Sequence, residues 1–261
     1  MTAPASPPTL AIQGRVATVT LNRPAQRNRL ENQDLEALLR HFDAVDADPE
    51  VQLLVLTANT EGQPRPIFCS GYDISGFDDD PLRANAFEAV PERLMHLKPV
   101  TLCALNGSVY GGATDLVLAC DLRMVLQGIE WRMPATALGL HYYPSGLRRY
   151  MSQFGTAATQ RAFLTARPLR TEQLQALGLF EGFHDQDHWP AALEALVQDV
   201  LALSPLALQA TKRSIVELSL GQGSDERMRE RANQSALSED FAEGRAAFAQ
   251  RRKPAFKPHG S

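Results

Sequence analysis

The 261-residue chain is poor in cysteine and tryptophan, with three and two residues. The odd number of cysteines (Cys69, Cys103 and Cys120) excludes a complete disulfide framework, and each has apolar neighbours, so we expect buried, reduced thiols. Long apolar runs are also missing, since none approaches the roughly 20 residues that span a membrane. Residues 1–9 lack the basic and apolar regions of a signal peptide. We therefore expect a disordered tail and a cytoplasmic protein without a membrane partner.

Charge of one sign is not in large excess, because the formal net charge is -4. This weak acidity disfavours nonspecific binding to nucleic acid or to anionic membranes. The sequence also lacks four motifs with characteristic spacings: a phosphate-loop lysine motif, a dinucleotide fingerprint, a nucleophile elbow and a zinc ligand set. We therefore predict no nucleic-acid partner, no metal and no tightly bound cofactor.

Short apolar strands alternate with amphipathic helical segments in the first part of the chain. The expected strands are Arg15–Leu21, Val51–Thr57, Ile67–Cys69, Val100–Leu105 and Leu122–Leu126. Helices are expected around residues 35–45, over 82–97 and from Ala113, which together indicate an α/β fold with mostly parallel connections. From Ser145 to Phe248 the pattern is mostly helical, with breaks at proline and glycine. We predict a tail at 1–9, an α/β core at 10–200 and a helical C-terminal oligomerisation region at 201–261.

Two glycine-containing segments, Phe68–Ile74 and Gly107–Leu116, follow expected strands. Glycine there lets the backbone turn sharply and approach a ligand closely. The second segment also opens a helix, whose first N–H groups lack helical partners and favour negative charge. One N–H group from each segment could together hold a developing oxyanion. Two tight turns without a ligand are the alternative.

Several motifs occur in the order that is usual for one enzyme family. They are Leu21–Pro24 with Asn28 and Leu30, Phe68–Ile74, Lys98–Pro99 ahead of Asn106–Gly107 and Gly111–Gly112, Ser204–Ala207 with Lys212, and Ser238–Phe241 through Gly244 to Arg252–Pro254. From about residue 10 to residue 257 the chain resembles the enoyl-CoA hydratase/isomerase (crotonase) family. The resemblance implies a ClpP/crotonase-like spiral of ββα units, a helical trimerisation region, and a homotrimer or dimer of trimers. It also implies an acyl-CoA substrate, with coenzyme A as part of that substrate.

The resemblance assigns the two oxyanion donors to the backbone N–H groups of Tyr72 and Gly112. Because the donors belong to the backbone, the side chain at position 72 is free to vary, and only proline removes the N–H. The same resemblance implies coenzyme A contacts from Arg27, Arg29, Ser70, Asp73, Ile74, Phe256 and Lys257. The last two commonly reach the neighbouring subunit. Solvated charges and a packing aromatic are the alternative roles.

The residues that would select a reaction depart from the hydratase pattern. Hydratases of the family carry two glutamates, which match Asp115 and Ala135, and a methyl group cannot transfer a proton. Gly139–Tyr143 resembles a loop of methylmalonyl-CoA decarboxylases whose tyrosine matches Tyr142, and Asp80–Arg83 is also similar to these enzymes. Their histidine in the first oxyanion segment is replaced by Tyr72, and their acid at the position of Asp115 is usually glutamate.

We therefore predict a CoA-thioester lyase that works through an enolate, with decarboxylation of a malonyl- or methylmalonyl-type thioester preferred. Tyr142 would hold the substrate carboxylate, and His141 would donate the final proton, because histidine titrates near neutral pH. The structural alternatives are a packed aromatic for Tyr142, a surface group for His141 and a helix-stabilising acid for Asp115. The functional alternatives are hydration by Asp115 alone, hydrolysis, and a catalytically silent acyl-CoA binder or scaffold.

Overall fold

The computed structural model describes residues 6–74 and 84–257. Strands of this part of the chain form two sheets, one of six strands and one of four. The large sheet contains, in its spatial order, β1 (Thr9–Gln13), β2 (Val16–Leu21), β3 (Leu53–Ala58), β5 (Val100–Leu105), β7 (Leu122–Leu126) and β10 (Gly182–His184). The small sheet contains β4 (Ile67–Cys69), β6 (Ser108–Tyr110), β8 (Glu130–Arg132) and β9 (Leu169–Arg170).

The helices follow the strands in a repeated pattern. They are α1 (Asn32–Ala47), α2 (Ala84–Met95), α3 (Gly112–Leu118), α4 (Pro144–Thr165), α5 (Thr171–Gln175), α6 (Trp189–Leu201), α7 (Pro205–Ser219), α8 (Asp225–Ala236) and α9 (Glu239–Gln250). Three times, a strand of the large sheet is followed by a strand of the small sheet and then a helix: β3–β4–α2, β5–β6–α3 and β7–β8–α4. The predicted α/β fold built from ββα units is confirmed.

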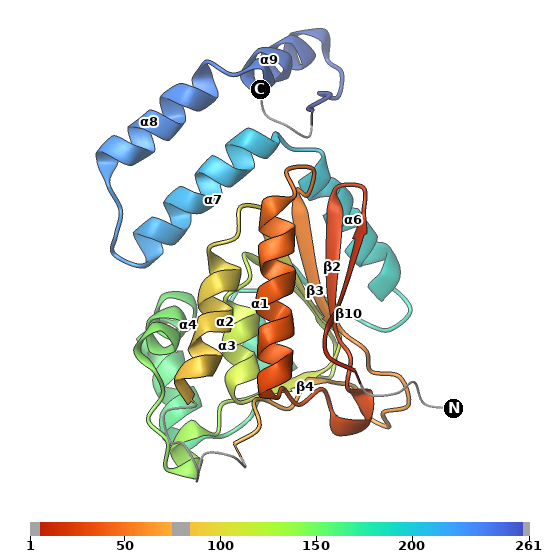
Figure 1. The fold of residues 1–261 in the computed structure, drawn as a ribbon, viewed down its shortest axis with the longest axis vertical. Helices are drawn as coiled ribbons and strands as arrows, with labels where there is room; N and C mark the ends of the chain where they lie inside the picture. Colours follow the sequence, from red (N-terminus) through yellow and green to blue (C-terminus); the bar gives the residue numbers. More distant parts are fainter. Residues whose placement is uncertain (1–5, 75–83, 258–261) are drawn as a thin grey trace.

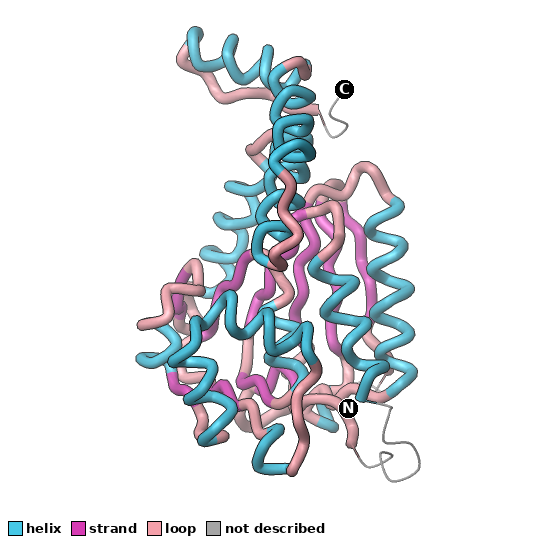
Figure 2. Tube along the Cα trace, turned by 90° about the vertical axis from the view of Figure 1, so that its left-hand side faces the viewer, coloured by secondary structure: helices cyan, strands magenta, loops and turns pink. Residues whose placement is uncertain are grey.

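Hydrophobic patterning explains why the large sheet lies in the middle of the core. All six residues of β5 are buried, as expected for a parallel strand that is covered on both faces. The neighbouring pairs from β2 to β10 are parallel, and only the edge pair β1–β2 is antiparallel. Helix α1 covers one face of this sheet and α6 lies on the opposite side (Figures 1 and 2). A sheet covered on both sides leaves room for a ligand only at the strand ends.

The helices α7, α8 and α9, which we call the C-terminal arm, extend away from the two sheets (Figure 1). The buried Lys212 side chain joins α7 to the core by donating to Asp121 at 2.8 Å and to the carbonyl oxygen of Pro99 at 2.7 Å. Beyond this anchor the arm exposes large apolar residues, with Leu237 and Phe248 both 88% exposed. The division of the chain at residue 200 stays a prediction.

The strands predicted from continuous apolar runs are confirmed, with ends shifted by at most two residues. The strands β1, β6, β8, β9 and β10 were not predicted. Four of these are two or three residues long, which is too short for periodicity to show, and two of them interrupt the region expected to be helical. The predicted buried thiols are confirmed, because Cys69, Cys103 and Cys120 are buried and free. The segment Asp80–Arg83 lies outside the described residues.

Among residues 6–74 and 84–257, no single helix has both the length and the apolar character needed to cross a membrane, although α6 and α7, bent by 99°, meet that test as a pair.

Candidate active site

A set of buried polar contacts shapes the loop after β2. The Nε of Arg23 donates to both oxygens of Asp34, at 3.0 and 2.9 Å. Asn28 accepts from the Arg23 backbone N–H at 2.9 Å and donates to the carbonyl oxygens of Asn59 and Ile67. These contacts give the motif Leu21–Leu30 a structural role, since they hold this loop beside the end of β3 and the start of β4.

The loop then pairs with the first glycine segment. The backbone N–H of Leu30 donates to Gly71 at 2.9 Å, and Asp73 donates back to Leu30 at 2.8 Å. Gly71 has a φ of +102°, and a Cβ atom there would lie 3.1 Å from the carbonyl oxygen of Tyr110. Because neither Gly71 nor Gly111 carries a side chain, the two glycine segments touch through their backbones. This contact directs the residues that follow, Tyr72 and Gly112, toward the same space.

That space is a cavity of about 390 Å³ with mainly apolar walls. Its lining consists of Ser70, Gly71, Tyr72, Ile74, Phe87, Gly111, Gly112, Met133, Pro134, Ala135, Leu138, Leu140, His141, Tyr142, Tyr143 and Pro144. The cavity thus brings both predicted oxyanion donors, Tyr72 and Gly112, together with His141, Tyr142, Ser70 and Ile74. Ala135 contributes only a methyl group to this wall.

Asp115 is fully buried behind this wall and is not among the lining residues. Arg149, which is also buried, donates from Nε to Oδ1 and from Nη2 to Oδ2, each at 2.9 Å. The Nη1 of Arg149 donates further to Glu92 at 2.7 Å. The bidentate contact fixes the orientation of the Asp115 side chain. Sequence reasoning did not identify Arg149, whose position 34 residues after Asp115 gives no local signal.

Tyr143 connects Asp115 with the cavity, and sequence reasoning missed this role as well. Its hydroxyl donates to Oδ2 of Asp115 at 2.6 Å, and the hydroxyl of Tyr142 donates to that of Tyr143 at 2.9 Å. The two rings are stacked, with centroids 4.2 Å apart. Burial, followed by the charge of Asp115, raises the pKa of Tyr143, and the pKa of Tyr142 is raised for the same reasons. Both hydroxyls therefore stay protonated.

These hydrogen-bond directions bear on the predicted role of Tyr142. An ionised carboxylate only accepts hydrogen bonds, and each tyrosine has one proton to donate. The proton of Tyr142 is directed to Tyr143, and that of Tyr143 to Asp115. In this arrangement the Tyr142 proton is used within the protein, and its contact with a substrate carboxylate stays a prediction. The exposed His141 lies at the cavity, and its role as proton donor stays a prediction.

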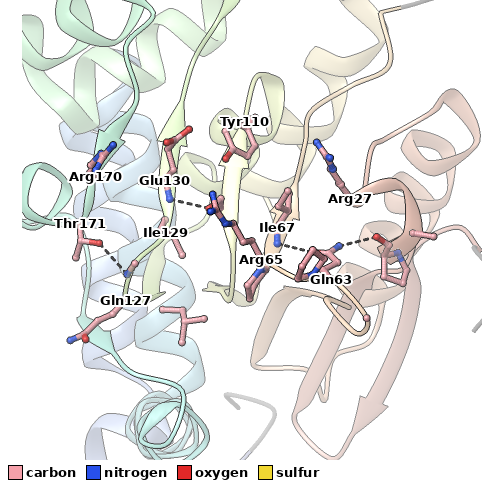
Figure 3. Close-up of a pocket in the computed structure, with 18 of the residues that line it drawn as sticks. Arg27, Gln63, Arg65, Ile67, Tyr110, Gln127, Ile129, Glu130, Arg170 and Thr171 are labelled. Atoms are coloured by element: carbon pink, nitrogen blue, oxygen red, sulfur yellow. Dashed lines mark hydrogen bonds between the residues drawn. The ribbon is translucent and has the colours of Figure 1, made fainter. Parts of the chain in front are cut away.

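The residues predicted to bind coenzyme A fall into separate places. Arg29 forms ion pairs with Glu31 at 3.1 Å and with Asp73 at 3.3 Å, beside the cavity. Arg27 instead lines a second pocket of about 1050 Å³ at the small sheet, where Figure 3 shows it with Arg65 and Arg170. Between Arg27 and Arg29 the chain makes a left-handed turn, with φ of +55° at Arg27 and +51° at Asn28. Arg27 thus lines the second pocket, whereas Arg29 lines neither that pocket nor the cavity.

Phe256 and Lys257 lie at the end of the C-terminal arm. Lys257 pairs with Glu239 of α9 at 3.2 Å, and Phe256 lies against α9 near Gly244. The arm lies far from β4 (Figure 1), and the residues that follow β4 line the cavity. One subunit therefore does not bring these two residues to its own cavity. Their predicted action on a neighbouring subunit is untested.

In the part of the chain that the structure describes, no group of three or more His, Cys, Asp or Glu side chains is placed to hold a metal ion.

The family model for enoyl-CoA hydratase/isomerase matches residues 11–259, so the chain belongs to this family. Among curated relatives, the 2,3-dehydroadipyl-CoA hydratase of Escherichia coli is 29% identical over 94% of this chain and 96% of its own length. The (E)-benzylidenesuccinyl-CoA hydratase of Thauera aromatica is 27% identical, over 96% of this chain and 99% of its own.

Solved structures agree with this assignment. The enoyl-CoA hydratase subunit I of Geobacillus kaustophilus is 26% identical and superimposes with a TM-score of 0.85, over 98% of this chain and 100% of that one. An enoyl-CoA hydratase/carnitine racemase from Magnetospirillum magneticum has a TM-score of 0.86 at 24% identity, over 97% and 96% of the two chains, and this likeness shows the fold alone.

Proposed function

We propose that this protein is an acyl-CoA lyase that stabilises a thioester enolate between the backbone N–H groups of Tyr72 and Gly112. The observation that carries the proposal is the meeting of the two glycine segments at one apolar cavity. A developing negative charge is stabilised most by donors that are already in place in a site that excludes water. Membership of the enoyl-CoA hydratase/isomerase family supports an acyl-CoA thioester as the source of that charge.

Hydration of an enoyl-CoA is the reaction that the site favours. The hydroxyl of Tyr142 donates to Tyr143, and that of Tyr143 donates to Asp115. Both hydroxyl oxygens therefore present acceptor lone pairs to the cavity. A water molecule can donate to such an oxygen, whereas a substrate carboxylate cannot. The named relatives from Escherichia coli and Thauera aromatica are hydratases, which supports the same reaction.

Decarboxylation of a malonyl-type thioester is the second candidate. Ala135 and the apolar wall favour it, because loss of carbon dioxide requires no second acid at that position. The direction of the Tyr142 hydrogen bond counts against it, and the named relatives do not support it.

Parallel assays of crotonyl-CoA hydration and methylmalonyl-CoA decarboxylation test both candidates, with Gly112→Pro and Gly112→Ala as matched variants. A Cβ at position 112 lies 2.9 Å from the Phe87 ring in either variant, but only proline removes the N–H donor. We expect hydration by the wild type, and a kcat for Gly112→Pro that is about 10²–10³-fold below that of Gly112→Ala.

Hydration, decarboxylation and binding without turnover give different results in these assays. Carbon dioxide release without hydration would establish the second candidate. Equal activity of the two Gly112 variants would refute the backbone oxyanion hole. Binding of both thioesters without turnover of either would identify a silent acyl-CoA binder.

We also propose a homotrimer, or a dimer of trimers, in which Phe256 and Lys257 reach a neighbouring subunit. The exposed apolar residues of the C-terminal arm support this assembly, since the arm has little core of its own.

A further inference from the structure

We infer that Tyr143 is a catalytic residue, which passes a proton between the reacting water and the buried carboxylate of Asp115. This inference rests on the proposed hydration, because it names the group that carries out the proton transfer of that reaction. It replaces direct action of Asp115 on the substrate with action through a tyrosine hydroxyl.

Burial of Asp115 is the first reason. The side chain has no exposed surface, and it does not line the cavity, whereas Tyr143 does. Oδ1 accepts from Arg149, and Oδ2 accepts from both Arg149 and Tyr143. A substrate in the cavity meets the hydroxyl of Tyr143 before it can meet the carboxylate.

The direction of the hydrogen bonds is the second reason. A tyrosine oxygen has one proton and two acceptor lone pairs. Tyr143 gives its proton to Asp115 and uses one lone pair for the hydroxyl of Tyr142. The remaining lone pair can accept a hydrogen bond from a water molecule in the cavity. Water held in this way is oriented for attack, with a path along which its proton can leave.

The step balances without any further reactant. The water oxygen bonds to the β-carbon while its proton passes to Tyr143 and the proton of Tyr143 passes to Oδ2 of Asp115. The π electrons of the carbon–carbon double bond shift into the bond between the α-carbon and the carbonyl carbon, and the carbonyl π electrons move onto the thioester oxygen, which gives the enolate. The proton then returns from Asp115 through Tyr143 to the α-carbon, so that one water has been added. One carboxylate thus serves as base and then as acid, which suits a site with Ala135 in its wall.

The surroundings hold this relay rigidly. Arg149 fixes Asp115 from behind, and Glu92 fixes Arg149. The Tyr143 ring lies between the stacked Tyr142 ring and Phe87, whose centroid is 6.4 Å away. A proton relay requires such order, because each transfer depends on hydrogen-bond distance and alignment.

The experiment compares Tyr143→Phe with Tyr142→Phe, since each change removes one hydroxyl from the same stacked pair. We measure kcat and KM for crotonyl-CoA hydration, the affinity for butyryl-CoA by calorimetry, and exchange of the butyryl-CoA α-protons in D2O. For Tyr143→Phe we expect kcat and the exchange rate to fall about 10²–10⁴-fold, with KM and affinity nearly unchanged. For Tyr142→Phe we expect a loss of about fivefold, because about 1 kcal/mol is lost with one neutral hydrogen bond.

A solvent isotope measurement adds a readout that a purely structural role would not move. Two protons move in one step of the relay. A plot of kcat against the D2O fraction should therefore be curved for the wild type and for Tyr142→Phe. The residual rate of Tyr143→Phe should vary linearly.

Each contrary result has its own meaning. A Tyr143→Phe variant that keeps kcat and exchange within tenfold would overturn the relay and leave hydration standing. A variant that loses butyryl-CoA affinity along with kcat would overturn it too, by showing a packing role. A wild type that neither hydrates crotonyl-CoA nor exchanges butyryl-CoA protons would overturn both the relay and the proposed hydration.

Discussion

The ion pairs beside the cavity and those of the C-terminal arm have similar lengths but different surroundings. The side chains of Asp115 and Arg149 are 0% and 1% exposed, whereas those of Lys257 and Glu239 are 74% and 66% exposed. An exposed pair is screened by water and contributes little to stability. A buried pair leaves a charge without compensation when one partner is lost. The exposed pair therefore adds little to the fold, whereas the buried pair fixes the orientation of Asp115.

The apolar residues show the same contrast. Around the cavity they are enclosed, as with Tyr142 at 6% exposure, and the core around them is complete within one chain. In the arm, Leu237 and Phe248 are exposed on the single subunit. The cavity is therefore lined by residues of the core, whereas the arm exposes large apolar side chains.

The largest effect is expected from Arg149→Met. It leaves the fully buried Asp115 without its ion-pair partner, which typically destabilises a protein by about 3–5 kcal/mol. Urea unfolding followed by circular dichroism measures the free energy of unfolding. The double variant Asp115→Asn with Arg149→Met removes both charges and should recover most of the loss. If the single variant were as stable as the wild type, the buried pair would not be formed in solution.

A smaller loss is expected from Gly146→Ala in α4. The added Cβ would lie 2.3 Å from Cε1 of Tyr142 and 2.6 Å from Cε2 of Tyr143, so the stacked rings must move. Overpacking of this kind destabilises by about 1–3 kcal/mol, and the displaced Tyr143 should also lower the hydration rate. Thermal unfolding and kcat check this against Ser152→Ala, an exposed position on the same helix. Equal results for the two variants would mean that the rings are not held against α4.

The third prediction concerns pH and the arm. The hydrogen bond from Arg252 lowers the pKa of Glu243 to about 2, from an ordinary value of 4.5. Because the pKa is lower in the folded arm, this interaction is fully present above pH 4.5 and is lost as the pH falls toward 2. The amide of Ala255, which donates to Glu243 at 2.7 Å, should report the change in an NMR titration. Glu243→Gln should remove this low-pH transition, and its persistence would assign the transition to another group.

The smallest effect on the subunit itself is expected from Leu237→Ser and Phe248→Ser. Both side chains are 88% exposed, so the stability of an isolated subunit should change by no more than about 0.5 kcal/mol. If the arm mediates assembly, the molar mass measured by sedimentation should fall toward that of one chain. An unchanged assembly would place the contacts elsewhere, and a monomeric wild type would contradict the proposed trimer.

The parts of the fold that could be predicted are those with strong local patterns. The apolar runs of β3 and β5 and the glycine segments at Gly71 and Gly111 are visible in the sequence because each depends on its own residues. Strands such as β9, with two residues, exist only because a neighbouring strand pairs with them. Their position depends on tertiary structure, which no short pattern contains.

The site shows the same limit. Tyr142 and Tyr143 are adjacent, and the sequence does not tell which hydroxyl reaches Asp115. That is decided by the start of α4 at Pro144, which directs the Tyr143 hydroxyl to α3. The turn at Arg27 likewise depends on a left-handed backbone conformation, with φ of +55°. An arginine in the sequence does not predict this conformation. Side-chain direction was therefore the information that the sequence lacked.

The strand β10 has a consequence for synthesis of the chain. It pairs with β7 in the large sheet, yet more than fifty residues lie between Leu126 and Gly182. While a ribosome translates that interval, the backbone groups along one side of β7 have no strand to pair with. An open edge of this kind can pair with another polypeptide. A nascent chain that stalls before His184 is therefore more exposed to aggregation than one that has passed it.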